Sequence, residues 1–65
     1  MSKKLDILNA LSNIQGLIGF AQIMAIDATD LSENDRDNIH AECNDIDESI
    51  TELQQYVEDI DTVSN

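Results

Sequence analysis

Residues 17–26 read Leu-Ile-Gly-Phe-Ala-Gln-Ile-Met-Ala-Ile, and Gln22 is their only polar side chain. A helix made from this run is apolar on nearly every side, so it must be covered from every direction. The rest of a 65-residue chain covers only part of such a helix. Chains this short usually need disulfides, a metal or a partner subunit. The run therefore predicts an association surface as well as a core.

The composition favours an all-helical, single-domain protein. The chain has no proline, and its two glycines are the only poor helix formers in the interior. Cys43 is the only cysteine, which excludes a disulfide within the chain and fits a reducing compartment. The mainly apolar stretch 14–26, which Gln15 and Gln22 interrupt, is thirteen residues long, whereas a helix that spans a bilayer needs about 20. We therefore expect a cytoplasmic protein without a membrane partner.

The first helix is expected over about residues 4–28. Residues 1–4 should fray, since Lys3 and Lys4 lie at the positive end of the helix dipole, although Ser2 is a suitable cap. Apolar residues then recur in alternating steps of four and three, which forms one row along the helix. A second row lies beside it, and its members are seven residues apart. The first row is Ile7, Leu11, Ile14, Ile18, Ala21, Ala25 and Ala28, and the second is Ala10, Leu17 and Met24.

The second helix is expected over about residues 33–61, after a turn over about 29–32. Ser32 and Asp35 have the spacing of a capping box, which marks the start of this helix. Its apolar residues follow a strict heptad and nearly all others are polar, so one narrow face is buried. The heptad residues are Ile39, Cys43, Ile46, Ile50, Leu53, Val57 and Ile60. The tail, residues 61–65, should fray.

These features predict an all-α, two-helix antiparallel hairpin that dimerises into a four-helix bundle. The broad apolar face of the first helix exceeds the narrow stripe of the second. Ile18, Ala21 and Ala25 should meet the second helix of the same hairpin. The remaining apolar side is the expected interface with a second copy or another partner. Its residues are Gly16, Leu17, Gly19, Phe20, Ile23 and Met24.

In size and layout the chain resembles the Rop-type RNA-binding hairpins, which have two heptad helices joined by a short turn. The resemblance implies a dimeric four-helix bundle. Rop-type RNA binding depends on basic and polar side chains along one face of the bundle. Residues 5–31 of this chain include no lysine or arginine, so the RNA-binding activity is not expected here.

The sequence offers no convincing catalytic, metal or cofactor site. Cys43 lies on the apolar heptad beside acidic neighbours, which is unlike a reactive thiolate. Asp37 and His40 share a helix face, but the apolar heptad contains no carboxylate that would complete a bundle metal site. An enzyme would need a site built across subunits from Asp37, His40 and Tyr56. We expect a protein that is not an enzyme and carries no cofactor.

The charge is strongly acidic, with 14 acidic residues against three basic ones and a net charge of -11. Such a chain is repelled by nucleic acid, and any partner that it binds through its charge must present a basic surface. The expected acidic partner-binding face consists of Asp45, Glu48, Glu52, Glu58 and Asp59. It suggests a mimic of nucleic acid that inhibits a nucleic-acid-handling protein, of the phage anti-restriction or anti-CRISPR type. Two alternatives stay open: charge that only maintains solubility, and a structural or chaperone-like hairpin that binds another chain through the first helix.

Overall fold

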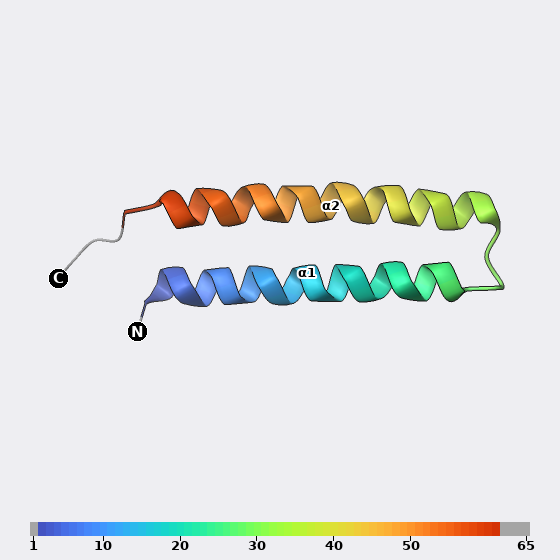
Figure 1. Cartoon of the computed structure of the whole chain (residues 1–65), viewed down its shortest axis with the longest axis horizontal. Coiled ribbons are helices and arrows are strands. Elements are labelled where there is room, and N and C mark those ends of the chain that lie inside the picture. The colour runs from blue at the N-terminus through green and yellow to red at the C-terminus, as the bar shows by residue number, and fades with distance from the viewer. Residues whose placement is uncertain (1, 62–65) are drawn as a thin grey trace.

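The structure is a helical hairpin, seen in a computed structural model that describes residues 2–61 of the chain. Helix α1 spans Lys3–Asp27 and helix α2 spans Glu33–Asp59. The helices lie side by side and antiparallel, with the connecting turn at one end (Figure 1). Residues 2–61 contain no strand. The predicted all-α, two-helix hairpin is therefore confirmed, whereas its assembly into a four-helix bundle stays a prediction.

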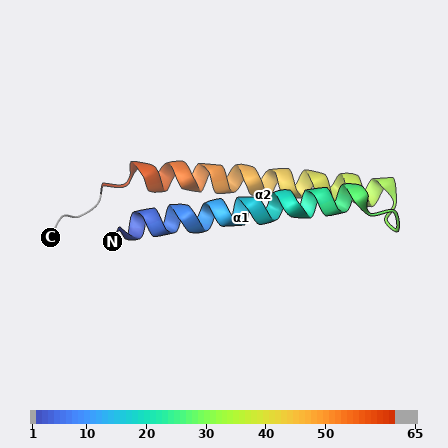
Figure 2. The same ribbon diagram turned by 60° about the horizontal axis from the view of Figure 1, so that its bottom comes forward.

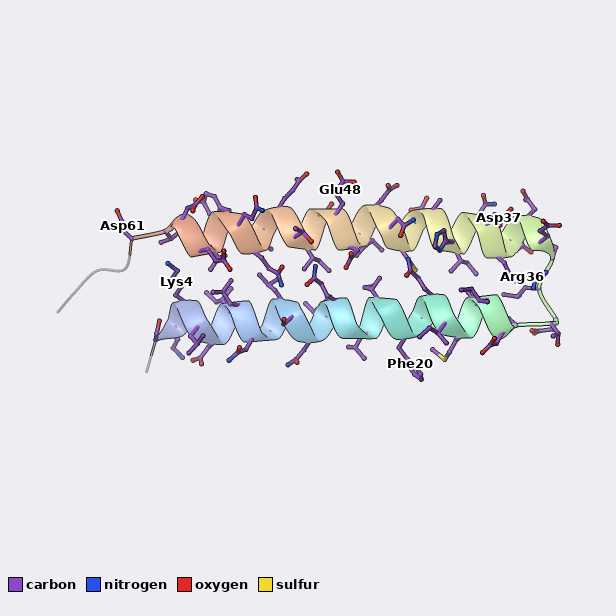
Figure 3. The ribbon with its side chains drawn as sticks, in the orientation of Figure 1. Lys4, Phe20, Arg36, Asp37, Glu48 and Asp61 are labelled. Carbon is purple, nitrogen blue, oxygen red and sulfur yellow. The ribbon has the colours of Figure 1, made fainter. Side chains whose placement is uncertain are left out.

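The start of α1 is ordered by a cap and by a contact with α2. The Ser2 hydroxyl accepts the Leu5 backbone N–H at 3.4 Å, so the helix begins at Lys3. Lys4 Nζ donates to the backbone carbonyls of Glu58 at 2.6 Å and Ile60 at 3.0 Å, across the hairpin (Figure 3). Antiparallel pairing places this cation at the negative end of the α2 dipole. The expected fraying of residues 3 and 4 is therefore wrong; Met1 lies outside the described residues.

Caps define both ends of the turn. The Ala28 backbone N–H donates to the Ala25 carbonyl at 3.2 Å as α1 ends. The Ser32 hydroxyl accepts the Asp35 N–H at 3.1 Å, which is the capping contact expected from the sequence. Glu33 and Asp35 lie in the first turn of α2, where the helix dipole favours negative charge. Asp61 is not helical, and the rest of the tail expected to fray, residues 62–65, lies outside the described residues.

The core is a single file of side chains between the helices. Leu11 and Ala25 of α1 are buried, together with Cys43, Ile50 and Val57 of α2. Leu8 and Ile18 are half-buried and pack against the cluster of Leu11, Ile50 and Val57. The expected contact of Ile18 and Ala25 with α2 is present, and Ala21 is half-buried. One position in each predicted heptad is thus buried, spaced seven residues apart on both helices.

The other half of each predicted heptad is not buried, which corrects the sequence interpretation. Ile14 is 42% exposed, Ile46 43% and Leu53 47%, and Ile7 and Ile60 are similarly open. A two-stranded coiled coil packs both heptad positions against its single partner helix. In this hairpin the helices are rotated away from that geometry, so one position per heptad faces the other helix and the second lies to the side.

The hairpin is long and thin. Its Cα atoms extend over 55 × 18 × 8 Å, and the two helices cross at a shallow angle (Figure 2). The radius of gyration is 15.7 Å, whereas a compact chain of this length has about 11 Å. The accessible surface is 5186 Å², against about 4,100 Å² for a compact monomer of this mass. A single hairpin therefore exposes roughly 1,000 Å² more than a compact fold would.

Candidate interaction surfaces

One side of the hairpin, the polar flank, is closed by side-chain amides. Gln15 Nε2 donates to Thr51 Oγ1 at 2.9 Å, and Gln15 Oε1 accepts from Gln54 Nε2 at 3.0 Å. Nearer the turn, Gln22 Nε2 donates to Asn44 Oδ1 at 3.0 Å. We define the polar flank by these five residues. These amides hydrogen-bond across the hairpin and so link α1 to α2 along this side.

The opposite side, the apolar flank, follows from helix geometry. Residues three and four positions after a core residue leave the helix on opposite sides of the core. Gln15 is four residues after Leu11, and Gln54 is four residues after Ile50; their hydrogen bond places both on the same flank. Residues three positions after a core residue, or four positions before one, therefore share the other flank. We define the apolar flank by six of these residues, namely Ile7, Ile14, Ala21, Ile46, Leu53 and Ile60.

An open depression of about 290 Å³ lies on the α2 part of the apolar flank. It is lined by Asp45, Ile46, Ser49, Ile50 and Leu53, all from α2. This depression was not predicted from the sequence, because Ser49 looks like an ordinary exposed polar position. The spacing of residues 46, 49, 50 and 53 could have predicted it, since these positions surround one point on a helix surface.

Of the interface predicted from the sequence, Phe20 and Ile23 lie on the outer side of α1, which faces away from α2, whereas Leu17 and Met24 directly precede Ile18 and Ala25 and so lie beside the apolar flank. Phe20 and Ile23 are each 58% exposed, and Leu17 and Met24 are also exposed. Phe20 points away from α2 (Figure 3). These side chains are therefore available to a partner, as an association surface requires.

The two glycines near that interface are not required by contacts within the hairpin. Gly16 is exposed and Gly19 is half-buried. A Cβ atom added at either position would meet nothing within 4 Å. The predicted role of these glycines, a close approach by another helix, would therefore depend on a partner chain.

The outer side of α2 carries an acidic stripe. Asp45, Glu48, Glu52 and Asp59 are exposed and separated by three, four and seven residues, which keeps them on one face. Glu48 points away from α1 (Figure 3). Glu58 is exposed but directly precedes Asp59, so it lies about 100° around the helix. The structure therefore groups four of the five predicted acidic residues and separates Glu58 from them.

The linear charge density of α2 is close to that of a nucleic acid strand. Residues 42–59 include seven carboxylates and no basic residue. At about 1.5 Å per residue, this segment carries roughly one negative charge per 4 Å of helix axis when all its faces are counted, and the four residues of the acidic stripe are on average about 7 Å apart along the axis. One strand of DNA carries one phosphate per about 3.4 Å of duplex axis.

The residues considered for chemistry do not form one site. Asp37 and His40 line an open depression of about 400 Å³ at the turn end, together with Ile26, Glu33 and Arg36. Tyr56 is sixteen residues beyond His40, roughly 24 Å along α2. Cys43 is a buried free thiol. Within residues 2–61, no three His, Cys, Asp or Glu side chains are grouped so that they could hold a metal ion.

Helix α1 also meets a simple criterion for a membrane span. Its 25 residues are long enough, and a window within it has a mean hydropathy of 1.2. The helix is longer than the thirteen apolar residues considered in the sequence. Core helices of soluble proteins and signal sequences meet the same criterion, so length and composition alone do not assign α1 to a bilayer.

No protein-family model, curated protein or solved structure matches this chain. The functional proposal therefore depends on the surfaces of the hairpin themselves.

Proposed function

We propose that this chain is a non-enzymatic, acidic protein-binding module that acts as a homodimer in the cytoplasm. It occupies a basic surface of a nucleic-acid-handling protein in place of the nucleic acid, and so inhibits or regulates that protein. The observation that carries the proposal is the separation of surfaces. The acidic stripe lies on the outer side of α2, and the exposed apolar residues lie elsewhere. One surface can therefore bind a partner while another joins two copies.

Electrostatics supports a basic target. The chain has a net charge of -11, and a dimer carries twice that charge. A field of this strength speeds encounter with a basic groove and repels nucleic acid and anionic membranes. The linear charge density of α2, counted over all its faces, is close to that of one nucleic acid strand. Restriction enzymes and CRISPR effectors are targets with grooves for nucleic acid.

The surplus surface supports the homodimer. The hairpin exposes roughly 1,000 Å² more than a compact monomer. A stable protein interface buries about 800 Å² on each partner. Association of two hairpins would remove about the area by which one hairpin exceeds a compact fold, and would produce a four-helix bundle.

A competition experiment tests the charge mechanism. The full chain is added to gel-shift assays of a panel of restriction and CRISPR effector proteins with their DNA. We expect the wild-type chain to displace DNA from at least one panel member. The variant Asp45→Asn/Glu48→Gln/Glu52→Gln/Asp59→Asn should lose this effect by about tenfold or more, because it removes four charges from the contact.

The matched control removes the same charge from scattered positions. Asp6, Asp27, Asp30 and Asp37 are exposed and lie outside the acidic stripe. Their replacement by asparagine should reduce displacement much less than the stripe variant does. Equal losses in the two variants would show that net charge acts without a defined acidic face. Absence of displacement across the panel, or displacement unaffected by either variant, would contradict the proposal.

A second candidate function is favoured by the outer side of α1. Leu17, Phe20, Ile23 and Met24 are exposed on one helix, and a structural or chaperone-like hairpin would bind another chain there. Light scattering separates the two functions. The first requires a stable dimer of the purified chain. The second predicts a monomeric or aggregating chain that becomes stable when its partner is added.

A further inference from the structure

We infer that a second copy of the chain docks on the apolar flank, where one of its apolar side chains enters the depression formed by Ile46, Ser49, Ile50 and Leu53. The inference rests on the proposed homodimer and names the surface that forms it. It places the dimer contact away from Phe20 and Ile23, which the sequence analysis had included in the predicted interface.

The depression has the geometry of a hole in helix packing. Four of its five lining residues, Ile46, Ser49, Ile50 and Leu53, occupy positions i, i+3, i+4 and i+7 of α2, and the fifth is Asp45 of the acidic stripe. In knobs-into-holes packing, four residues with this spacing surround one inserted side chain from a facing helix. Helix α1 of the same chain contributes no residue to this lining. The hole therefore opens toward a helix that the hairpin itself does not supply.

A second copy is the occupant that matches the pattern on both helices. The apolar flank has residues from α1 and from α2 at heptad spacing, including Ile7 and Ile14 opposite Leu53 and Ile60. A two-fold dimer brings the same flank of each copy together, so each hole faces a surface rich in isoleucine and leucine. With the flank covered, both positions of every predicted heptad enter one core.

The other sides of the hairpin fit a second copy less well. The polar flank is closed by the hydrogen bonds of Gln15 and Gln22. The outer side of α1 exposes Phe20 and Ile23, but α2 contributes nothing to it. The acidic stripe lies on the outer side of α2, and Asp45 is its one residue that also lines the depression, so docking on the apolar flank leaves Glu48, Glu52 and Asp59 outside the contact. The six residues of the apolar flank carry no charge.

Sedimentation equilibrium of the full chain tests the surface. Ile46→Glu and Leu53→Glu each put a charge on the apolar flank. We expect each to raise the dimer dissociation constant by about 100-fold or more, because two unpaired carboxylates would be buried in a symmetric contact. Phe20→Glu and Ile23→Glu are matched controls on the outer side of α1, and should change the constant by no more than about twofold. The reverse result would overturn the inference.

A further variant fills the hole without adding charge. Ser49 is exposed in the hairpin, so Ser49→Trp is accommodated by a single chain but obstructs an incoming side chain. We expect it to weaken the dimer by about tenfold or more, whereas Ser49→Ala should leave the dimer unchanged. This pair decides the question if the glutamate variants lose helical circular dichroism. A dimer of wild-type affinity with Ser49→Trp would overturn the inference.

These size measurements contain no target protein. If the chain forms a dimer that depends on the apolar flank but displaces no DNA, the charge mechanism is rejected and the proposed interface is retained. Displacement that persists while the flank variants remain dimeric would support the proposed function and reject the interface.

Discussion

The two flanks of the hairpin differ in the contacts that their side chains make within the chain. On the polar flank, Gln15 and Gln22 reach across to α2, and their amides pair with side chains of the same chain. On the apolar flank, Ile46 and Leu53 border an open depression and stay nearly half exposed. Both flanks lie beside the same file of core residues. One side of the hairpin therefore carries hydrogen-bonded amides, and the other leaves apolar side chains exposed to solvent.

This difference shows how a narrow hairpin can define a place for the next helix. Each amide of the polar flank keeps donors or acceptors that only water solvates, and an apolar surface would remove that water, so the polar flank resists burial. Apolar side chains at heptad spacing gain from burial and have no hydrogen bonds to lose. The proposed association should therefore use the apolar flank and not the polar one.

The largest expected effect comes from the core that both flanks share. Leu11→Ala removes a buried side chain of the central cluster and should destabilise the hairpin by about 2–4 kcal/mol. Thermal unfolding followed by circular dichroism measures the loss. Leu5→Ala makes the same chemical change at an exposed position and should cost less than about 0.5 kcal/mol. Similar losses in the two variants would contradict the assigned core.

The polar flank can be made to resemble the apolar one. The double variant Gln15→Leu/Gln22→Leu replaces both amides with apolar side chains of similar size and helix propensity. Because both flanks would then be apolar and able to associate, the chain should form species larger than a dimer, which multi-angle light scattering detects. Gln55→Leu adds one leucine at an exposed position off the flanks and should leave the dimer unchanged. A double variant that stayed dimeric would show that the amides do not limit assembly.

The smallest expected effect comes from variants that test whether the dimer contact lies at the apolar flank or at the glycines of α1. Gly16→Ala and Gly19→Ala place a methyl group where nothing lies within 4 Å. Each should stabilise the hairpin by about 0.5–1 kcal/mol, because alanine loses less backbone entropy in a helix. The dimer dissociation constant should not rise. A weaker dimer in either variant would return the interface to the glycine side of α1.

Much of the hairpin was predictable from local sequence. The break near Asp27 and the cap at Ser32 depend on neighbouring residues, so the two helices and their turn followed from the sequence. The seven-residue spacing of Leu11 and Ile18, and of Ile50 and Val57, indicated which residues meet. The exposed acidic residues of α2 were also correctly separated from its core.

The rest depended on how the helices are paired. A heptad stripe does not say how many helices surround it, so the rotation that exposes Ile14 and half-buries Gln15 was not visible in one chain. Lys4 looked misplaced at the start of its own helix. It is favourable only because antiparallel pairing brings it to the end of α2. The hole beside Ser49 likewise exists only in the folded helix.

Sedimentation equilibrium of the wild-type chain at two salt concentrations tests the central claim most directly. Two copies joined through uncharged flanks repel each other through their net charges of -11. Screening weakens this repulsion, so the dimer should form at about 50 mM salt and become tighter at about 500 mM. A chain that stays monomeric at both concentrations, or a dimer that dissociates as salt increases, would contradict association through the apolar flank.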